Sequence, residues 1–436
     1  MTGKRATRSS DMKKLLVVLV AFGCVVSAPV MAQAPGQGPA PVRMEFDAVI
    51  KQAIDRNPTI ARAATNIRRA ETLLQQARAF TLPTLSTSIT NATLDSARSF
   101  GSGTIQPRNQ TVIGASAAVP VLAASRWAEL QQARDQIVVA EASTAEVRQQ
   151  IVVAAAQAYL AVTAAHRQVD VSTRSLESAR THLDYAQKRF EGGAGSRLNQ
   201  LRAAQVVSTE ETRLEAIQFA LRTAQEALGV LIAADGPIDS GAEPVFDQTG
   251  AMDEDAWRKA RPDLITQAAV QRSAERVFKD SWKDLVPDVT ASFDPTFLTP
   301  AGLFQPSRTW RFTISTNYYL FEGGLRKVVE KQRGITLEQA KLTLTELEIQ
   351  ARSEVRLAQE AVLSRSRALA SARRSAEQAA EVVTITTSAF EVGATTNIEV
   401  IDAQREQRDA DTAVAIAENA LQRARLELLV AIGRFK

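Results

Sequence analysis

Cysteine, histidine and long apolar runs are scarce in this chain of 436 residues. The sequence holds one cysteine, Cys24, and two histidines, His166 and His182. So few sulfur and imidazole groups exclude a disulfide framework and leave no metal-ligand spacing, and no phosphate loop or nucleophile elbow is present. These absences argue against an enzyme and predict neither a cofactor nor a bound metal. Beyond the N-terminal region, no segment approaches the roughly 18 uninterrupted apolar residues of a membrane helix.

Residues 1–32 are typical of a secretory signal. Met12–Lys14 begins a basic region, residues 15–26 form an apolar run of 12, and residues 30–32 offer a cleavage site before Gln33. The apolar run is too short for a membrane span. We therefore expect an exported protein whose mature chain begins at Gln33 and holds no cysteine for disulfides.

The charge of the chain is balanced once this segment is set aside. The segment carries five basic residues and one acidic residue, which leaves 47 of each sign in the mature chain. A net charge of zero gives no support for a nucleic-acid partner.

Cys24 offers an alternative fate for the N-terminal segment, as the attachment site of a lipid anchor. Gly23 before it suits lipidation, whereas Ala21 and Phe22 fit the pattern of such signals poorly. Cleavage before Gln33 is the preferred interpretation.

The sequence also repeats itself. Without a gap, Pro58 aligns with Pro262 at an offset of 204, and Phe190–Glu191 aligns with Phe390–Glu391 at an offset of 200. The same order of elements recurs in both halves, so the chain is a duplication. The predicted organisation is a signal peptide at 1–32, a first repeat at 33–233, a linker at 234–252 and a second repeat at 253–436.

Each repeat is predicted to hold a helix, two strands, a long helix, a turn and a return helix. From Leu130 to Phe190, apolar residues that are mostly alanine recur in steps of three and four over eight heptads, as in a coiled coil. A helix from Ser125 to Phe190 would be about 99 Å long, whereas the opening helix, Asp47–Phe80, and the return helix, Leu198–Ile232, would each be about 50 Å. Two short helices stacked end to end would therefore match one long helix.

Alternation of apolar and polar residues predicts strands between the helices. The expected strands are ~84–98 and ~109–121 in the first repeat and ~287–298 and ~308–321 in the second. Residues 286–322 hold eight of the chain's 23 aromatic side chains. An apolar outer face with aromatic girdles is typical of a transmembrane β-barrel, and a soluble hairpin packed on a core is the alternative. The side chains expected to face lipid are Phe293, Trp310, Phe312 and Tyr318.

Four strands cannot close a membrane barrel, because open sheet edges are excluded from lipid and single-chain barrels begin at about eight strands. The subunit must therefore share its barrel with other copies. The predicted fold is mainly α with a membrane β-barrel, in which a homotrimer builds a 12-stranded barrel continuous with a 12-column α-helical tunnel.

The order of these elements, together with two short motifs, resembles the TolC-like outer membrane efflux family. The motifs are Leu320–Gly324, which ends the last strand, and Phe390–Thr395, which leads to Val400–Gln404. The resemblance covers nearly the whole mature chain, although the first-half counterpart of the strand exit, Pro120–Ser125, lacks the acidic residue and both glycines.

This resemblance implies an outer membrane channel with a long periplasmic portion, which works with a periplasmic adaptor and an inner membrane pump. The chain would then be a passive exit duct for small molecules such as drugs or other toxic solutes. The alternatives are the outer membrane component of a type I protein secretion system and a soluble periplasmic coiled-coil adaptor or scaffold.

The resemblance also implies where the functional residues lie. The turns near Gly193 and Gly393 would be periplasmic tips that contact the adaptor, and glycine permits the positive φ that such a reversal needs. Glu399 and Asp402 match the family's acidic ring at the periplasmic mouth, where six carboxylates of a trimer would attract cations. An ordinary solvated helix face is the alternative for these two residues. The expected tip residues are Gly193, Ala194, Gly195, Gly393, Ala394 and Thr395.

The gate departs from the family's pattern. Members hold the mouth shut with a tyrosine and an arginine, whose positions here are Phe390 and Thr395, while Asn199 replaces an acidic partner. Phenylalanine has no hydroxyl group and threonine has no charge, so those locking bonds cannot form. Arg197 or packing is expected to hold the aperture instead, unless the aperture is looser.

Overall fold

The computed structural model describes residues 40–246 and 253–435. The chain divides into two units, Met1–Ala40 and Pro41–Lys436, and the fold below is that of the second unit. The predicted signal peptide, its Cys24 and residues 247–252 of the predicted linker lie outside the described residues.

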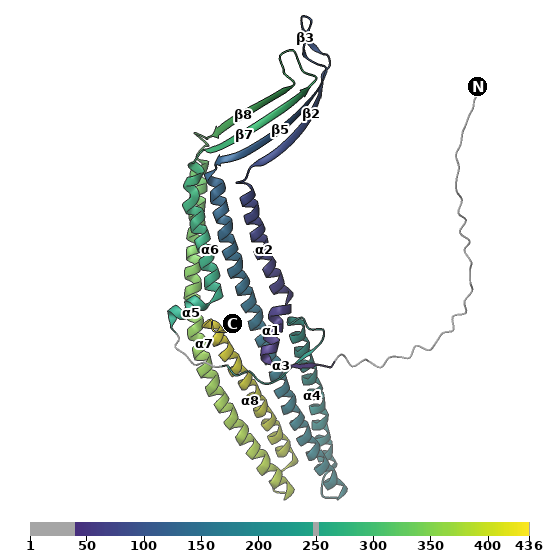
Figure 1. The fold of residues 1–436 in the computed structure, drawn as a ribbon. Coiled ribbons are helices and arrows are strands. Elements are labelled where there is room, and N and C mark those ends of the chain that lie inside the picture. Colours follow the sequence, from purple (N-terminus) through teal and green to yellow (C-terminus); the bar gives the residue numbers. More distant parts are fainter. Residues whose placement is uncertain (1–39, 247–252, 436) are drawn as a thin grey trace, which may run out of the picture. The chain divides into compact units, whose positions relative to one another are not determined.

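Two long helices dominate the second unit. α3 (Ala124–Glu191) has 68 residues and α7 (Leu325–Glu391) has 67. α3 contains neither proline nor glycine, so no residue breaks its hydrogen-bond ladder. Each long helix reverses into a helix of 35 residues, α4 (Arg197–Leu231) and α8 (Asn397–Ala431), so that two antiparallel hairpins lie below the sheet in Figure 1.

The opening helix of the first half is broken in two. α1 (Phe46–Arg56) ends before Asn57, and α2 (Pro58–Ala79) begins with a proline at its first position. The prediction of one helix over Asp47–Phe80 is therefore wrong. Proline has no N–H and disfavours helical geometry in the preceding residue, and Asn57 is accordingly extended, with φ −65° and ψ 123°.

The second half repeats this break. α5 (Glu254–Ala260) ends before Arg261, and α6 (Pro262–Lys279) again starts with proline. A short 3₁₀ helix, η1 (Asp280–Leu285), then leads into the sheet.

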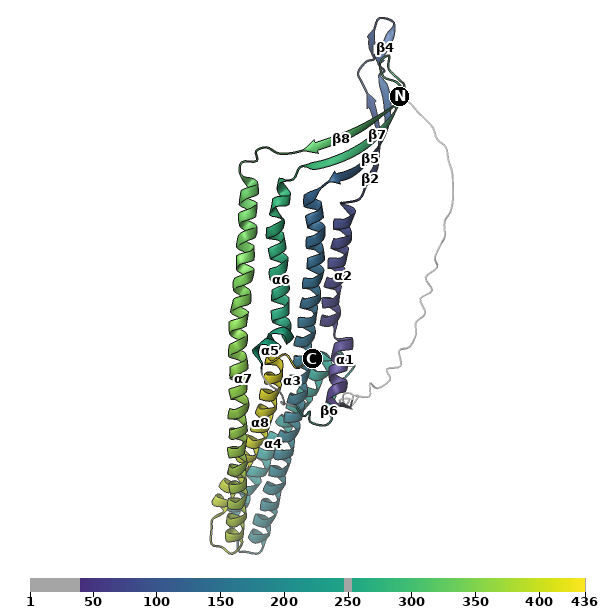
Figure 2. The ribbon, with the colours of Figure 1, turned by 60° about the vertical axis from the view of Figure 1, so that its left-hand side comes forward.

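The residue before each proline also binds the end of the return helix. The Asn57 side-chain Nδ2 donates to the carbonyl oxygen of Leu231 at 2.7 Å, and Arg261 Nη1 donates to that of Ala431 at 3.4 Å. These bonds satisfy carbonyl groups that a helix C-terminus leaves without partners. The start of α2 is thereby tied to the end of α4, and the start of α6 to the end of α8 (Figure 2).

Four strands form an antiparallel sheet in the order β2-β5-β7-β8. The strands are β2 (Thr84–Thr93), β5 (Asn109–Leu122), β7 (Asp288–Thr299) and β8 (Arg308–Asn317). Neighbours in this order come from both halves, because β5 pairs with β7. Within the described chain the sheet does not close, so β2 and β8 each keep one free edge.

Two predicted strand ends were too long. β2 stops at Thr93, and residue 98 belongs to a separate hairpin of β3 (Arg98–Phe100) and β4 (Gly103–Gln106). β8 stops at Asn317, which pairs with the first residue of β7, Asp288, so residues 318–321 have no neighbouring strand to continue the ladder.

A small parallel pair of strands was not predicted. β1 (Val42–Met44) pairs with β6 (Ile238–Ser240) beside α1 and α3. Val49, Tyr159 and Leu228 are fully buried there, and they bring the two ends of the first half together. No helix in the described part of the chain is both long and apolar enough to cross a bilayer.

Candidate functional site at the hairpin tips

The two hairpins end in turns of the same geometry. Gly193 and Gly393 have φ values of +76° and +79°, a region that glycine adopts without strain. In each turn the alanine after the glycine donates its backbone N–H to the carbonyl oxygen five residues earlier. The distances are 2.9 Å for Ala194 to Arg189 and 2.8 Å for Ala394 to Ala389. Of the residues expected at the tips, Gly195 and Thr395 are half-buried and the other four are exposed. Side chains beside the turns are apolar and exposed, namely Phe190, Leu198, Val392 and Ile398.

The two carboxylates expected at the aperture have local partners. Glu399 is exposed and completes a capping box, in which its Oε2 accepts from the Thr396 backbone N–H at 3.2 Å. Asp402 forms an exposed ion pair with Arg405 at 3.3 Å. A capping box stabilises a helix N-terminus, so Glu399 has a structural task that sequence reasoning did not assign to it.

Phe390 is buried, at 7% exposure, and packs against the other hairpin. Its ring lies 5.7 Å from the rings of His182 and Tyr185, measured between centroids. The guanidinium carbon of Arg189 lies 5.4 Å from the Phe390 ring centroid, and Arg189 Nη1 donates to the Phe390 carbonyl oxygen at 3.2 Å. The Phe390 ring therefore joins the two hairpins by packing.

Arg197, the other expected gate residue, has its observed partners within its own hairpin. Its Nη1 donates to Gln200 at 2.9 Å, and its guanidinium carbon lies 5.7 Å from the Phe190 ring. Asn199 lies in the first turn of α4, where its backbone N–H donates to Ser196 Oγ at 3.2 Å. Arg189 reaches the second hairpin, and sequence reasoning missed it.

A line of polar contacts continues from Phe390 along the two hairpins. His182 Nε2 lies 2.7 Å from Asn397 Oδ1, and the two side chains are 6% and 3% exposed. Further along, Gln404 Nε2 donates to Ser178 Oγ at 3.1 Å. We call this line, together with the ion pair described next, the hairpin seam. It comprises His182, Glu210, Asn397, Gln404 and Arg408.

The hairpin seam ends in a buried ion pair between Arg408 on α8 and Glu210 on α4. Their side chains are only 14% and 3% exposed. Glu210 also accepts from Ser175 Oγ at 3.2 Å, and Arg408 also binds Asp409 at 2.9 Å. A buried carboxylate is costly unless it is paired and hydrogen-bonded, so loss of Arg408 alone would leave Glu210 without compensation while the hairpins remain together.

Burial perturbs two titratable groups of the hairpin seam. It lowers the pKa of His182, and the hydrogen bond with Asn397 only partly opposes this shift. Burial also acts to lower the pKa of Arg408, but hydrogen bonds to Asp409 and Glu210 outweigh it and raise that pKa. The hairpin seam therefore holds a neutral histidine and a charged arginine near neutral pH.

The aromatic residues expected to face lipid lie on or beside the sheet. Phe293 and Phe312 are paired across β7 and β8, and the Phe293 and Trp310 ring centroids are 6.0 Å apart. Phe293, Trp310 and Phe312 are 44%, 71% and 59% exposed. Tyr318 lies just beyond β8, with the guanidinium carbon of Arg326 5.4 Å from its ring centroid. Large aromatic side chains that are exposed together are typical of a surface that contacts a membrane or another protein.

A sheet with two free edges, joined to long helical hairpins and built from a duplicated chain, is the architecture of TolC-like outer membrane channel subunits. The chain belongs to the outer membrane efflux protein family, whose sequence profile matches residues 49–234 and 255–434. The resemblance drawn from the sequence is thereby confirmed. The family and its fold are those of channel proteins of the outer membrane and not of enzymes.

Solved structures share the fold at low sequence identity. VceC from Vibrio cholerae is 16% identical with a TM-score of 0.75, over 89% of this chain and 96% of that chain. CusC is 16% identical with a TM-score of 0.80, over 92% and 95%. The MtrE outer membrane channel of Neisseria gonorrhoeae is 16% identical with a TM-score of 0.74, over 89% and 88%.

One curated relative is similar in sequence over part of its length. Nodulation protein T of Rhizobium leguminosarum bv. viciae is 25% identical over 285 residues, which are 61% of this chain and 57% of that protein. The chain thus matches little more than half the length of this relative.

Proposed function

We propose that this chain is one subunit of a trimeric exit duct in the outer membrane, through which small molecules leave the cell passively. The duct would receive them from a periplasmic adaptor and an inner membrane pump. The observation that carries this proposal is the open four-stranded sheet with exposed aromatic side chains, joined directly to two long hairpins.

Two surfaces support assembly with further copies. The free edges of β2 and β8 offer unpaired backbone groups, which lipid does not tolerate. Along α7, apolar side chains are exposed at intervals of seven residues, a spacing that a neighbouring helix would cover as a coiled coil. These side chains are Val328, Ile335, Leu342 and Ile349, with 63%, 48%, 62% and 59% exposure. Three copies would complete 12 strands.

The tips are proposed to contact the adaptor, and the hairpin seam to hold the periplasmic mouth narrow. Exposed Val392 and Leu198 beside the turns give the adaptor an apolar surface. Breaking the buried contacts of the hairpin seam, above all Arg408 with Glu210, would let the hairpins of one subunit part. Glu399 and Asp402 would then set the charge near the opening.

The assembly experiment measures the mass of the detergent-solubilised protein, taken from an outer membrane fraction. The expected result is three copies of the chain, together with ion conductance in planar bilayers. A stable monomer, or a protein that fractionates without detergent, would contradict the proposal. The second outcome would favour the soluble coiled-coil interpretation.

A further inference from the structure

Two arginines lie at the end of the four-stranded sheet that points away from α3 and α7 (Figure 1). Arg108 directly precedes β5, and Arg308 is the first residue of β8. The two positions correspond at the offset of 200 in the duplication, and both side chains are exposed. Both halves of the chain therefore carry a cation where the strand that returns to the helices begins.

Strand register places Arg308 on the apolar face of the sheet. Arg308 pairs with Phe297 on β7. Phe297 in turn pairs with Ile113 on β5, which pairs with Ile89 on β2, and all three apolar side chains are exposed. Paired residues lie on one face of a sheet, as do alternate residues of one strand. Arg308 therefore shares the face of Phe312, at the end of a row of apolar side chains.

This row is the outer edge of the apolar face. One row farther from the helices, the same face carries the paired residues Asn91, Thr111 and Thr299. An apolar band bordered by aromatic side chains is typical of the level at which hydrocarbon meets headgroups. An arginine at this level keeps its stem on apolar surface while its guanidinium reaches the headgroups. The Arg308 guanidinium carbon accordingly lies 5.7 Å from the Phe297 ring centroid.

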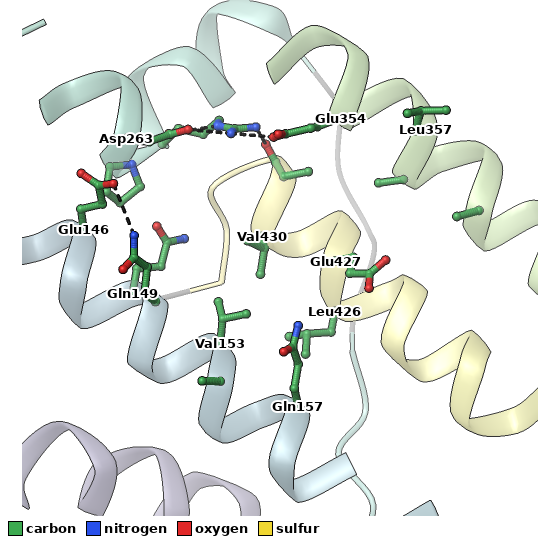
Figure 3. A pocket seen from close by; sticks show the side chains of 17 residues that line it. Glu146, Gln149, Val153, Gln157, Asp263, Glu354, Leu357, Leu426, Glu427 and Val430 are labelled. Atoms are coloured by element: carbon green, nitrogen blue, oxygen red, sulfur yellow. Dashed lines mark hydrogen bonds and ion pairs between the residues drawn. The ribbon is translucent and has the colours of Figure 1, made fainter. Parts of the chain in front are cut away.

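Arginines in other parts of the fold have their charge balanced by carboxylates. Near the helix end of β8, Arg326 lies 5.4 Å from the Tyr318 ring centroid, and its Nε also pairs with Glu322 at 2.9 Å. Between the helices, the guanidinium of Arg261 binds Asp263 at 2.7 Å and Glu354 at 2.8 Å, and Figure 3 draws both contacts as dashed lines. These arginines have no charge left for an external anion.

The arginines at the far end of the sheet lack such partners. Within the part of the chain that the structure describes, neither Arg108 nor Arg308 forms an ion pair with a carboxylate. The segments that join the strands at this end, 94–107 and 300–307, contain one carboxylate, Asp95, and a further arginine, Arg98. This end of the sheet therefore has a net positive charge, and its complement is an anion.

We propose that this end of the sheet binds lipids with phosphate headgroups in the outer leaflet of the outer membrane, with Arg108 and Arg308 on the phosphate oxygens. A guanidinium binds phosphate through two parallel hydrogen bonds. In the proposed trimer, six such arginines would occupy alternate strands, about 10 Å apart. The inference rests on the outer membrane placement of the proposed function, and not on the conduction of solutes.

The test titrates lipid into the full-length protein in dodecyl maltoside micelles, by microscale thermophoresis. The probes are bisphosphorylated lipid A and the same lipid after removal of both phosphates. We expect the phosphorylated lipid to bind at least about tenfold more tightly, with an affinity that falls as salt screens the charges. Inorganic phosphate should displace no more lipid than chloride does at equal ionic strength. Equal affinity for the two lipids, or displacement by phosphate alone, would overturn the proposal in the unmutated protein.

Variants then assign the charge. Arg108→Gln/Arg308→Gln should bind bisphosphorylated lipid A about 25-fold more weakly, because each basic residue near an anionic surface contributes about fivefold. Lysine at both positions keeps the charge and should restore most of the affinity. The matched control, Arg326→Gln, removes a cation that also lies against an aromatic ring but is balanced by Glu322, and it should bind as the unmutated protein does. Retained affinity in the glutamine variant, or an equal loss in the control, would refute the assignment.

Mass and conductance measured on the same samples separate this inference from the exit duct. A trimer that conducts but binds both lipids equally would refute only the lipid site. A monomer that does not conduct but binds the phosphorylated lipid selectively would refute only the duct.

Discussion

Replacing Arg408 by methionine tests how much the ion pair of the hairpin seam contributes to the free energy that keeps the two hairpins together. The change keeps an apolar stem of similar length and removes the cation that pairs with Glu210, whose side chain is 3% exposed. Removing one partner of a buried pair costs about 3–5 kcal/mol, because the other charge is left without compensation. Ser175 still donates to Glu210 at 3.2 Å, so the lower end, about 3 kcal/mol, applies.

This cost raises the free energy only of the state in which the hairpins remain together, because hairpins that separate would expose Glu210 to water. A difference of about 3 kcal/mol shifts such an equilibrium about 150-fold toward parted hairpins. Single-channel recordings in planar bilayers should therefore show a larger open fraction or conductance for Arg408→Met. As the matched control, Arg373→Met removes a cation whose partner, Glu418, lies within the same hairpin, and it should leave the recordings unchanged.

The double variant Arg408→Met/Glu210→Leu decides whether charge is the cause. Removal of both charges leaves no uncompensated group, and such replacements are often neutral or stabilising. Its conductance should return close to that of the unmutated channel. The reasoning is refuted if Arg408→Met behaves like the unmutated channel, or if the double variant conducts as freely as the single one.

Four further predictions concern the tips, the mouth and the sheet. Burial lowers the pKa of His182, so protonation of this residue destabilises the hairpin seam. The hairpin seam therefore has its full stability above the ordinary histidine pKa of about 6.5 and loses it as pH falls below that value. Conductance should rise between pH 7 and pH 5, and His182→Gln should flatten the rise. Gly393→Glu should abolish efflux, measured by drug accumulation, while the proposed trimer survives, because it strains a φ of +79° and adds charge to the tip. Trp310→Arg should lower the free energy of unfolding in lipid by about 2–4 kcal/mol if its site is near the bilayer midplane, as measured in urea. Replacing Glu399 and Asp402 by alanine should weaken cation selectivity in reversal-potential measurements; unchanged selectivity would make them a solvated helix face.

The long helices could be predicted because their pattern is long. Steps of three and four that persist over eight heptads match the helical period and no strand period, and α3 extends only one residue beyond the predicted Ser125 and Phe190 at each end. The break at Asn57 was missed, although Pro58 carries its signal, because proline favours an extended conformation in the residue before it. The pairing of β1 with β6 was not readable, because three-residue strands carry no periodicity and join segments that lie far apart in sequence.

The candidate site was harder to predict for a different reason. His182 and Asn397 are 215 residues apart, and their contact depends on the register between two hairpins, which no local pattern sets. On a helix that is rich in charge, Arg408 cannot be told from a solvated arginine by sequence alone. The turn glycines Gly193 and Gly393 were readable, because a required positive φ leaves a residue-level signal.

The duplicated positions differ in sequence, so the contacts of the hairpin seam form only between the two hairpins of one subunit. At an offset of 200, the counterparts of His182, Glu210, Asn397 and Arg408 are Val382, Ala410, Arg197 and Ser208. Contacts between neighbouring subunits of the proposed trimer would present this second set, which cannot form the same histidine and arginine contacts. In the proposed trimer, widening the ring of six hairpins would change every hairpin contact at once, so its cost would be governed by the three seams. Arg408→Met in all three copies therefore acts three times on one transition, and conductance should rise much less in trimers that carry a single variant subunit.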